Sequence, residues 1–380
     1  MLVSHTAILK ANQGELKALA NLDEWTSRKV LPLFEVGPIT DAVRDRKYMK
    51  TSQTPTITYL NRKLDPIASS WTTQPAMVDG YQWAADARAE NGDHVIAYMV
   101  SRLRASGTSV IPVVGYDRWE SYDYRLGLKS IPPRSDGNYC VRLDSSAIED
   151  AAEPEHFKGN VRDIIEELGL EPTRCFALLD FADISMSTMS IEALVSKASR
   201  IILQLELLGF QYYIVAGCSF PSTINLAVTD RDSVGSVLRK EMLLWQTLRS
   251  EFPQLRIGSG DYGVRGPSTT EHPSKYTNGK IRHTVAKQMF VVRGHPFSND
   301  GGKYVQMYGL AATMTGSVNF LGGNFSWGDG QILLCSRQQA LGNLGHWIAI
   351  DTNHHLTFVV QEVEEFERAL VTRVFASNNA

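Results

Sequence analysis

The chain has 380 residues, a net charge of −3 and a sequence pI of about 6.3. Its 43% of apolar residues is enough for a large core and excludes a disordered chain. The small negative charge excludes a global attraction to nucleic acid or to anionic membranes, although it leaves room for a local basic groove.

Cysteine usage and the start of the chain predict a cytoplasmic protein. The four cysteines are far apart in the sequence and have neither metal-binding nor redox spacing, so we expect buried, reduced thiols at Cys140, Cys175, Cys218 and Cys335. The N-terminus has no apolar signal segment, and no apolar run is long enough to span a bilayer. We therefore expect no membrane partner.

The first 265 residues alternate apolar runs with helical patterns. Apolar runs predict strands at 5–11, 30–36, 75–80, 109–117, 139–144, 175–183, 211–220 and 255–262. An apolar period of 3.6 residues predicts helices at 14–22, 54–70, 94–107, 160–170, 191–209 and 233–252. The strand runs are continuously apolar, which is typical of parallel strands that are buried on both faces.

Eight β–α steps within residues 1–265 predict an α/β fold, a TIM-like (β/α)8 barrel. A doubly wound open sheet is the alternative. The barrel is favoured because the count is eight and because no glycine-rich dinucleotide motif follows the first strand.

Residues 266–380 are less regular, and we assign them to a C-terminal extension that completes the barrel or caps its mouth. The pattern at 303–317 indicates a helix, whereas 282–295 fits either strand or helix. The last apolar run, 356–376, begins like a strand and ends like a helix.

Ionisable or hydroxyl side chains stand at the ends of all eight predicted strands. In a barrel these ends gather at one rim, where active sites of this fold are built. The residues are Lys10, Glu35, Asp79, Asp117, Arg142, Asp144, Asp180, Asp183, Ser219 and Asp261. Five of them, namely Lys10, Glu35, Asp79, Arg142 and Asp180, are predicted to lie at one end of a closed sheet, with Lys10 paired to Glu35.

Converging carboxylates beside Lys and Arg can bind a divalent cation or shift each other's pKa for acid–base work. The candidate catalytic residues are Lys10, Glu35, Arg142, Asp180 and His354, and the candidate metal ligands are Asp79 and Asp144. A structural alternative exists for each, because Asp often caps helix N-termini and Arg–Asp pairs form salt bridges at barrel rims.

Two polar, aromatic bursts lie near the C-terminus, at 322–332 and 345–356. Four glycines in the first burst predict a shaped loop. The candidate substrate- or partner-binding residues are Trp327, Asp329, Trp347 and His355, although both tryptophans also fit a packing role. We expect both bursts to fold over the barrel mouth, so that His354 or His355 faces the carboxylates there and has a raised pKa.

Three other chemistries have weaker signals. A zinc site in the tail is disfavoured because HExxH spacing is absent and because adjacent His354 and His355 point to opposite faces of a strand. Aromatic and Arg residues at 68–74 and 116–127 suit base stacking or a partner surface, but no basic surplus supports nucleic acid. Cys218 and Ser219 lack the GxSxG motif of a nucleophile elbow.

The phrase AILKANQGELKAL at 7–19, followed by VLPLFEV, resembles the opening of the beta protein family. The loop SWGD at 326–329 and the segment with Trp347, His354 and His355 resemble the family's closing motifs, a SWGD-like loop and a G-x-x-x-W…HH segment. The matching positions are Lys10, Gln13, Gly14, Glu15, Pro32, Glu35, Trp327, Gly328, Asp329, Trp347, Asn353, His354 and His355. These phage-encoded and bacterial proteins of uncertain function often lie near mobile or defence-associated genes. The resemblance spans nearly the whole chain and implies a fold and a context, but no transferable catalytic residue.

Two functions from different classes therefore stay open. The first hypothesis is a recognition protein that uses the barrel as a scaffold and binds a protein partner or a small polar ligand at its mouth, in the setting of phage–host conflict. The alternative is a hydrolase of a phosphodiester or nucleotide-like substrate, assisted by a divalent cation. Converging carboxylate oxygens around one point would favour the hydrolase, and salt-bridged carboxylates would favour the scaffold.

Overall fold

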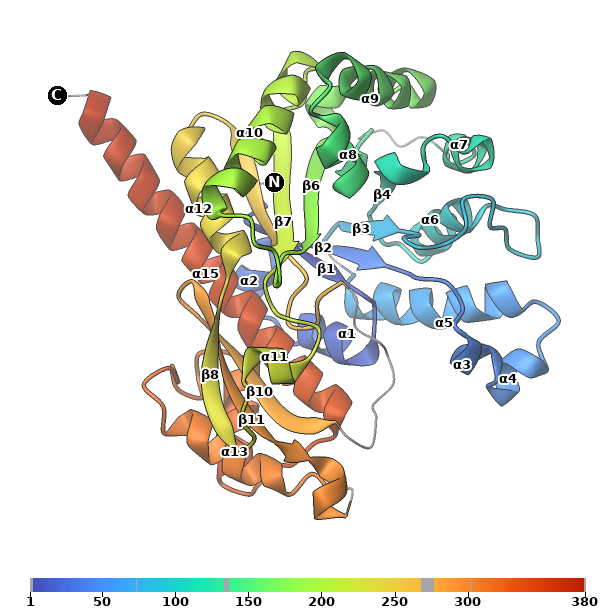
Figure 1. Ribbon diagram of the computed structural model, residues 1–380. Helices are drawn as coiled ribbons and strands as arrows, with labels where there is room; N and C mark the ends of the chain where they lie inside the picture. Colours follow the sequence, from blue (N-terminus) through green and yellow to red (C-terminus); the bar gives the residue numbers. More distant parts are fainter. Residues whose placement is uncertain (1–2, 73, 133–136, 268–276, 302, 379–380) are drawn as a thin grey trace.

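The computed structural model describes residues 3–72, 74–132, 137–267, 277–301 and 303–378. Eight parallel strands close into a barrel with helices around it (Figure 1), which confirms the TIM-like (β/α)8 fold. Parts of the predicted barrel region (1–2, 73 and 133–136) and of the predicted extension (268–276, 302 and 379–380) lie outside the described residues.

The barrel strands follow the predicted apolar runs. They are β1 (His5–Leu9), β2 (Val30–Glu35), β3 (Ala76–Asp79), β4 (Val110–Gly115), β5 (Cys140–Leu143), β6 (Phe176–Asp183), β7 (Tyr212–Cys218) and β9 (Arg256–Asp261). Strand β1 pairs in parallel with both β2 and β9, which closes the ring. All eight strands therefore end on the same side of the barrel.

Helices connect and cover these strands. The N-terminal half contains α1 (Gln13–Ala20), α2 (Glu24–Ser27), α3 (Asp41–Arg44), α4 (Lys47–Lys50), α5 (Pro55–Ser70), α6 (Val95–Ala105), η1 (Tyr116–Arg118) and α7 (Tyr122–Lys129). The later barrel helices are α8 (Ser145–Asp150), α9 (Pro154–Leu168), η2 (Pro172–Arg174), α10 (Ile191–Leu207), α11 (Ile224–Ala227) and α12 (Lys240–Glu251).

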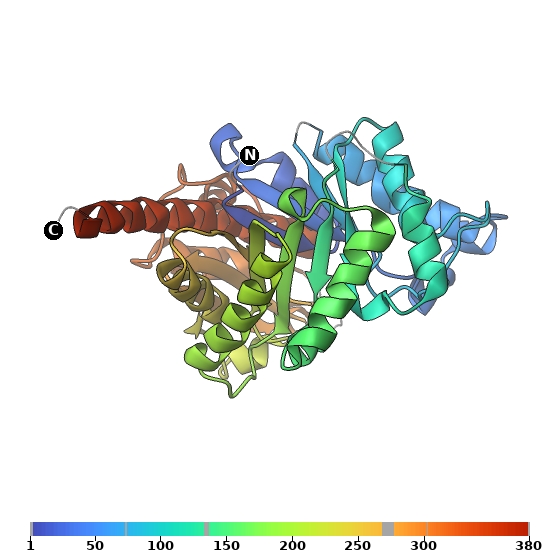
Figure 2. The ribbon, with the colours of Figure 1, turned by 90° about the horizontal axis from the view of Figure 1, so that it is seen from above.

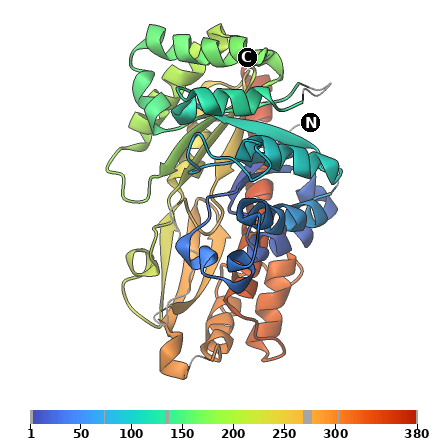
Figure 3. The ribbon, with the colours of Figure 1, turned by 90° about the vertical axis from the view of Figure 1, so that its right-hand side faces the viewer.

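A second, antiparallel sheet lies beyond the barrel in Figure 3. Its order is β10–β11–β8, with β8 (Ser233–Leu238), β10 (Asn278–Val285) and β11 (Gln288–Pro296). The remaining elements are η3 (Phe297–Asp300), α13 (Gln306–Thr315), α14 (Trp327–Ser336) and α15 (Leu344–Asn378). The barrel's interior core continues through Ile224 and Val228 to Met289 and Val291 of β11, so this sheet packs at the mouth side of the barrel.

Three local predictions were wrong, and the structure resolves one stretch that the sequence had left ambiguous. Residues 233–238 form β8 rather than the start of a helix, and residues 356–376 are helical throughout. The glycine-rich burst at 322–332 is a loop only as far as Ser326, which caps the N-terminus of α14. The ambiguous stretch at 282–295 belongs to the hairpin of β10 and β11.

The long helix α15 joins two hydrophobic cores. Its N-terminal part contributes Trp347 and Ile350 to the core between the second sheet, α13 and α14. Its middle contributes Leu356, Val359, Val360 and Val363 to the core between the barrel and its surrounding helices. Figure 2 shows its C-terminal part extending beyond the barrel. Among the described helices, none has the length and apolar character needed to cross a membrane.

Candidate functional site

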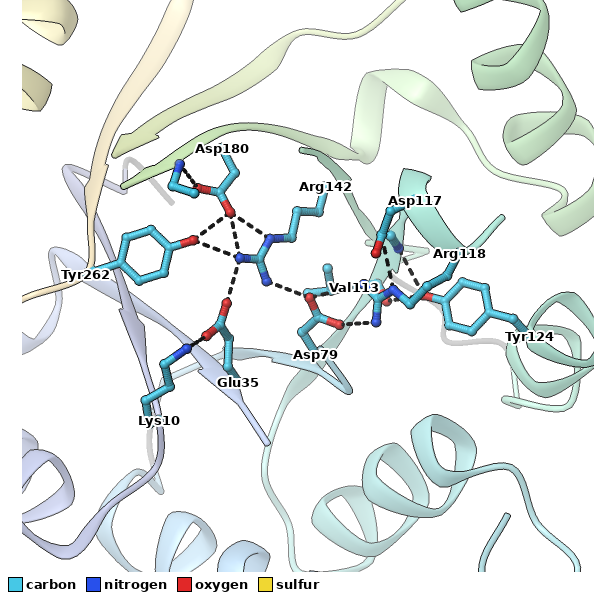
Figure 4. Close-up of polar contacts among 12 residues, drawn as sticks. Lys10, Glu35, Asp79, Val113, Asp117, Arg118, Tyr124, Arg142, Asp180 and Tyr262 are labelled. Atoms are coloured by element: carbon cyan, nitrogen blue, oxygen red, sulfur yellow. Dashed lines mark hydrogen bonds and ion pairs between the residues drawn. The ribbon is translucent and has the colours of Figure 1, made fainter. Parts of the chain in front are cut away.

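The C-terminal ends of the barrel strands carry a cluster that we call the mouth network: Lys10, Glu35, Asp79, Arg118, Arg142, Asp180 and Tyr262 (Figure 4). Side chains alternate along a strand, so Glu35 and Asp79 share the inward face of β2 and β3 with Leu33 and Met77 of the barrel interior. The five side chains predicted to lie together at one end of the sheet are therefore together.

Arg142 is the centre of this network. Its side chain is 1% exposed, and its guanidinium donates to three carboxylates. Nη2 lies 2.6 Å from Glu35 Oε1, Nη1 lies 2.8 Å from Asp79 Oδ2, and Nε lies 2.9 Å from Asp180 Oδ2. Nη2 also lies 2.9 Å from the hydroxyl of Tyr262, which itself donates to Asp180. A planar guanidinium has five N–H donors, which suits it to bridge several acceptors at once.

The register of the sheet explains why a cation is required here. Glu35 and Asp79 are direct neighbours across β2 and β3, so two like charges stand side by side. Burial opposes the ionisation of Asp79, but Arg118 and Arg142 outweigh it and hold the pKa of that carboxyl below its ordinary value. Burial and then Asp180 raise the pKa of the Tyr262 hydroxyl well above its ordinary value, so Tyr262 stays a hydrogen-bond donor.

Lys10 closes the network on the side of β1. It forms the predicted ion pair with Glu35, whose side chain is 1% exposed, whereas that of Lys10 is 17% exposed. The ammonium also lies 5.9 Å from the ring centre of Tyr81 and 5.8 Å from that of Tyr262. Lys10 is therefore a partly accessible cation above a buried carboxylate.

Arg118 neutralises the opposite side. This residue of η1 donates to Asp79 Oδ1 at 2.9 Å and to Asp117 at 3.1 Å. Tyr81 lies half-buried above the centre, with its ring 4.3 Å from the guanidinium carbon of Arg142. Lys10, Tyr81 and Asp117 thus keep some solvent exposure at the mouth, whereas the carboxylates bound by Arg142 are buried.

Asp144 does not join Asp79 as the expected second metal ligand. It is the N-cap of α8, and its side chain accepts from the backbone N–H of Ala147 at 3.4 Å. Burial, followed by the charge of Asp117, raises the pKa of Asp144. Asp79 in turn is bound by two guanidinium groups, so these two carboxylates have separate surroundings.

The expectation that His354 or His355 faces the mouth carboxylates was wrong. His354 lies 2.8 Å from Asp329 of α14, and His355 lies 2.9 Å from Asp261. Asp261 precedes the inward-pointing Tyr262, so alternation turns it to the outer face of β9, where α15 packs. The expected rise in pKa is also wrong for His355, because its complete burial lowers the pKa more than Asp261 raises it.

The two candidate tryptophans have different surroundings. Trp347 is buried, and its indole N–H donates to the backbone oxygen of Leu341 at 3.1 Å, which is a packing arrangement. Trp327 is partly exposed, with the ammonium of Lys17 5.4 Å from its ring and the ring of His346 5.7 Å away. A cavity of about 360 Å³ adjoins this group, lined by Gln13, Gly14, Lys17, Gly342, Asn343, Gly345 and His346.

Two buried groups of side chains have atoms placed to hold a metal ion. One comprises His5, Asp261 and His355, and the other comprises His283, Asp329 and His354. Both lie outside the mouth network, at the contacts of α15 with the barrel and with the second sheet. Burial, and then His354 beside it, lowers the pKa of His283 to about 2, so this imidazole is neutral.

Sequence reasoning missed several residues of these clusters. Tyr262 was not among the candidates, because the ionisable residue named at the end of the strand 255–262 was Asp261. Arg118 directly follows the predicted strand 109–117 and was considered only as part of the aromatic segment 116–127. His5 begins the first predicted strand, and His283 lies in the ambiguous stretch 282–295, so neither stands at the C-terminal end of a predicted strand. The alternation of side chains along β9 was the available signal that Tyr262, and not Asp261, points into the mouth.

Comparisons with known proteins agree with part of this picture. A family model described as Beta protein matches residues 6–361. Among solved structures, a trimodular endoglucanase of the GH5_4 subfamily is 8% identical, with 76% of this chain and 74% of that chain covered and a TM-score of 0.29. That likeness is too weak to carry an argument. No curated protein sequence matches the chain at a significant level.

Proposed function

Since this chain belongs to the beta protein family, whose model spans residues 6–361, we propose that it is a recognition protein that binds a small polar ligand at the barrel mouth. The observation that carries this proposal is the position of Arg142. Its guanidinium stands where the carboxylates of three strands converge, and each of them is hydrogen-bonded to it. The mouth is thereby a rigid, internally neutralised surface.

The accessible groups above this surface support the choice of a polar ligand. Lys10 offers a cation, Tyr81 offers an aromatic face and a hydroxyl, and Asp117 offers a partly exposed carboxylate. Charged and aromatic groups on a rigid scaffold fix the orientation of a ligand with little loss of side-chain entropy.

A hydrolase with a metal ion held by the mouth carboxylates has less support. Such a site requires several oxygens directed at one point. Here that point is taken by a guanidinium that is 1% exposed, and removing it would leave three carboxylates facing one another. Binding without turnover agrees better with this arrangement.

A thermal-shift screen tests the proposal. The purified chain is heated with a panel of amino acids, polyamines, nucleotides and sugar phosphates, and a ligand at about 100 times its Kd should stabilise it by about 2.7 kcal/mol. Lys10→Met should abolish the shift, whereas Lys129→Met, which changes an exposed lysine of α7, should retain it. The proposal of a small-ligand site would be contradicted if no compound of the panel gave a thermal shift that Lys10→Met abolishes. That result would favour a protein partner.

We extend the proposal to phage–host conflict, for which the family resemblance is the support. Cells that express the chain should differ from control cells in their efficiency of plating for at least one phage of a panel. The Lys10→Met variant, expressed at the same level, should lose that difference. Identical plating of all three strains over the whole panel would count against this context.

A further inference from the structure

A second group of polar side chains is sealed inside the protein, away from the barrel mouth. His283 comes from β10, Asp329 from α14 and His354 from α15. All three side chains are 0% exposed, and each offers one ligand-capable atom, all within 4.8 Å of one another. We call this group the buried triad.

The hydrogen bonds of His354 determine which of its nitrogens carries hydrogen. Its Nε2 lies 2.8 Å from the backbone oxygen of Thr284, which can only accept, so Nε2 must donate. In a neutral imidazole the other nitrogen, Nδ1, then carries a lone pair. That lone pair faces Asp329 Oδ2 at 2.8 Å, and two electron-rich atoms at this distance require a positive charge between them or beside them.

A proton shared by His354 and Asp329 would satisfy that one contact, but it leaves the rest of the triad unexplained. Among the described residues, no donor reaches Asp329 Oδ1, and neither ring nitrogen of His283 has a partner in good hydrogen-bond geometry, although the backbone of Asn319 is close enough to raise the pKa of this ring. The ring of His283 stacks on that of His354, with centroids 3.5 Å apart, and its Nε2 lies 3.8 Å from Asp329 Oδ1. Buried polar atoms without partners are rare in native proteins.

A metal ion accounts for His283 Nε2, His354 Nδ1 and the Asp329 carboxylate together, provided that the ring of His283 tilts out of its stack on His354 so that both nitrogens point at one ion. A separation of 3.8 Å is too long for a hydrogen bond, but it is spanned by two metal–ligand bonds of about 2.0–2.2 Å each. The outer contacts fit as well, because metal-bound imidazoles usually donate their other N–H to a carbonyl, as His354 does to Thr284. The hydroxyl of Ser326 donates to Asp329 Oδ2 and orients that carboxylate.

We propose that His283, Asp329 and His354 bind one divalent cation of the Zn²⁺ class, which joins β10, α14 and α15. Two imidazoles and a carboxylate suit Zn²⁺ better than the oxygen-preferring Ca²⁺ or Mg²⁺. The second oxygen of Asp329 or a water completes the coordination. Because the three ligands are fully buried and come from separate elements, the ion has a structural role and stabilises the second core.

The other histidine group supplies a matched control. Asp261 accepts from the backbone N–H of Gly263 at 2.8 Å and from His355 at 2.9 Å, and the other nitrogen of His355 meets the hydroxyl of Thr284 at 2.7 Å. These contacts of His355 are satisfied by a carboxylate and a neutral imidazole, whereas His5 Nε2, 3.3 Å from Asp261 Oδ1, completes no hydrogen bond among the described residues. Metal analysis of the His355 variant therefore also tests this second group. His355→Gln therefore removes a buried histidine of α15 without removing a proposed ligand.

Metal analysis of the untagged, full-length chain, purified without chelators, tests the proposal. The wild-type chain should carry about one equivalent of zinc, or take up one Co²⁺ with visible absorption bands after reconstitution. His283→Gln, with an unchanged far-ultraviolet circular dichroism spectrum, should lose the metal, whereas His355→Gln should keep it. Metal that stays with His283→Gln, or that leaves with His355→Gln, would overturn the assignment.

Two further readouts use only the wild-type chain and therefore do not depend on the folding of variants. A chelator should lower the thermal midpoint, and one equivalent of Zn²⁺ should restore it. X-ray absorption of the zinc-loaded chain should fit imidazole and oxygen ligands without sulfur. Wild-type protein with less than about a tenth of an equivalent of metal and no Co²⁺ bands after reconstitution would show that only a proton occupies the triad.

Discussion

At the scale of single residues, the mouth is organised by one arginine. Arg142 meets Glu35, Asp79 and Asp180 from three other strands, and all four side chains are buried. A buried carboxylate is tolerated only when it is paired and hydrogen-bonded. The burial of the three ionised carboxylates therefore depends on Arg142, which is the partner that they share.

Replacement of this arginine should be severe. Arg142→Met is expected to lower the free energy of unfolding by about 3–5 kcal/mol, because it leaves three buried carboxylates without their shared cation. Lys10→Met should lower it by only about 1 kcal/mol, because Lys10 is partly exposed and Glu35 keeps Arg142. Denaturant unfolding of both variants measures the difference, and equal losses would contradict a central role for Arg142.

The free energy of unfolding should depend on pH through the ionisation of Asp79. Its folded-state pKa is lowered from the ordinary value of 3.8 by Arg118 and Arg142, which outweigh burial. A depressed pKa stabilises the folded state above the unfolded pKa, and this contribution disappears as the pH falls below 3.8 and through the folded value. The gap in unfolding free energy between the wild type and Asp79→Asn should be constant near neutral pH and shrink in acid. If the difference in unfolding free energy between the two proteins grew in acid, the pKa of Asp79 would not be lowered in the folded state.

The sequence could identify the acids and bases of the mouth and the Lys10–Glu35 pair, but not the three carboxylate partners of Arg142. Lys10, Glu35, Asp79, Arg142 and Asp180 all lie at or near the ends of apolar runs, and this position was enough to place them together. Which of two adjacent residues points inward depends on the strand's phase, and a shift of one residue exchanges Asp261 for Tyr262. Asp144 ends the same apolar run as Arg142, yet it caps α8 instead.

At the scale of elements, the C-terminal motif is explained by helix packing. Gly328 of α14 is so close to α15 that an added Cβ would meet the backbone oxygen of Ile350. The N–H of Gly328 donates to Asn353 Oδ1 at 2.9 Å, and the amide of Asn353 donates to Ala18 of α1 at 3.0 Å. One asparagine thus connects three helices, which gives Gly328 and Asn353 a structural role.

A glycine substitution distinguishes this close approach from simple helix propensity. Gly328→Ala should lower the free energy of unfolding by about 1–3 kcal/mol, because the new methyl group forces α14 away from α15. Gly309→Ala in α13 has open space around the new methyl group, so it should be neutral or stabilise by up to about 1 kcal/mol. Thermal or denaturant unfolding measures both variants, and destabilisation of the same size at both sites would contradict the packing argument.

Elements with mixed patterns are the ones that the sequence did not resolve. Strand β8 is half-exposed in alternation and runs directly into the apolar period of α12, so one helix was predicted for both. The run LTFVV is rich in β-branched and aromatic residues, but in α15 it is helical because it packs against both the barrel and α1. Tertiary packing determined the secondary structure of both segments, and the local sequence pattern does not contain that information.

At the scale of the whole molecule, α15 makes the barrel and the second sheet depend on one another. Its residues Trp347 and Ile350 lie in one core and Val359 and Val363 in the other. Arg249 of α12 also donates to both oxygens of Glu367 in α15, at 2.6 and 3.0 Å. The predicted boundary at residue 265 between barrel and extension therefore separates β1 and α1 from α15, the helix that covers them.

A fragment of residues 1–265 should consequently fail to fold as a cooperative unit. It lacks α15, so it would expose the outer faces of β1, α1 and α12 that this helix buries. Circular dichroism and a thermal scan of the fragment check this, with the full chain as control. A sharp unfolding transition of the fragment would show that the barrel is an independent domain.

We propose that the barrel mouth binds its ligand without turnover because Arg142 holds the mouth carboxylates. A turnover assay measures this, with phosphodiester and nucleotide substrates and with Mg²⁺, Mn²⁺ or Zn²⁺ added to the wild type and to Glu35→Gln. We expect both proteins to give only the background rate of the metal-containing buffer. Hydrolysis by the wild type that falls at least about tenfold in a folded Glu35→Gln variant would contradict it.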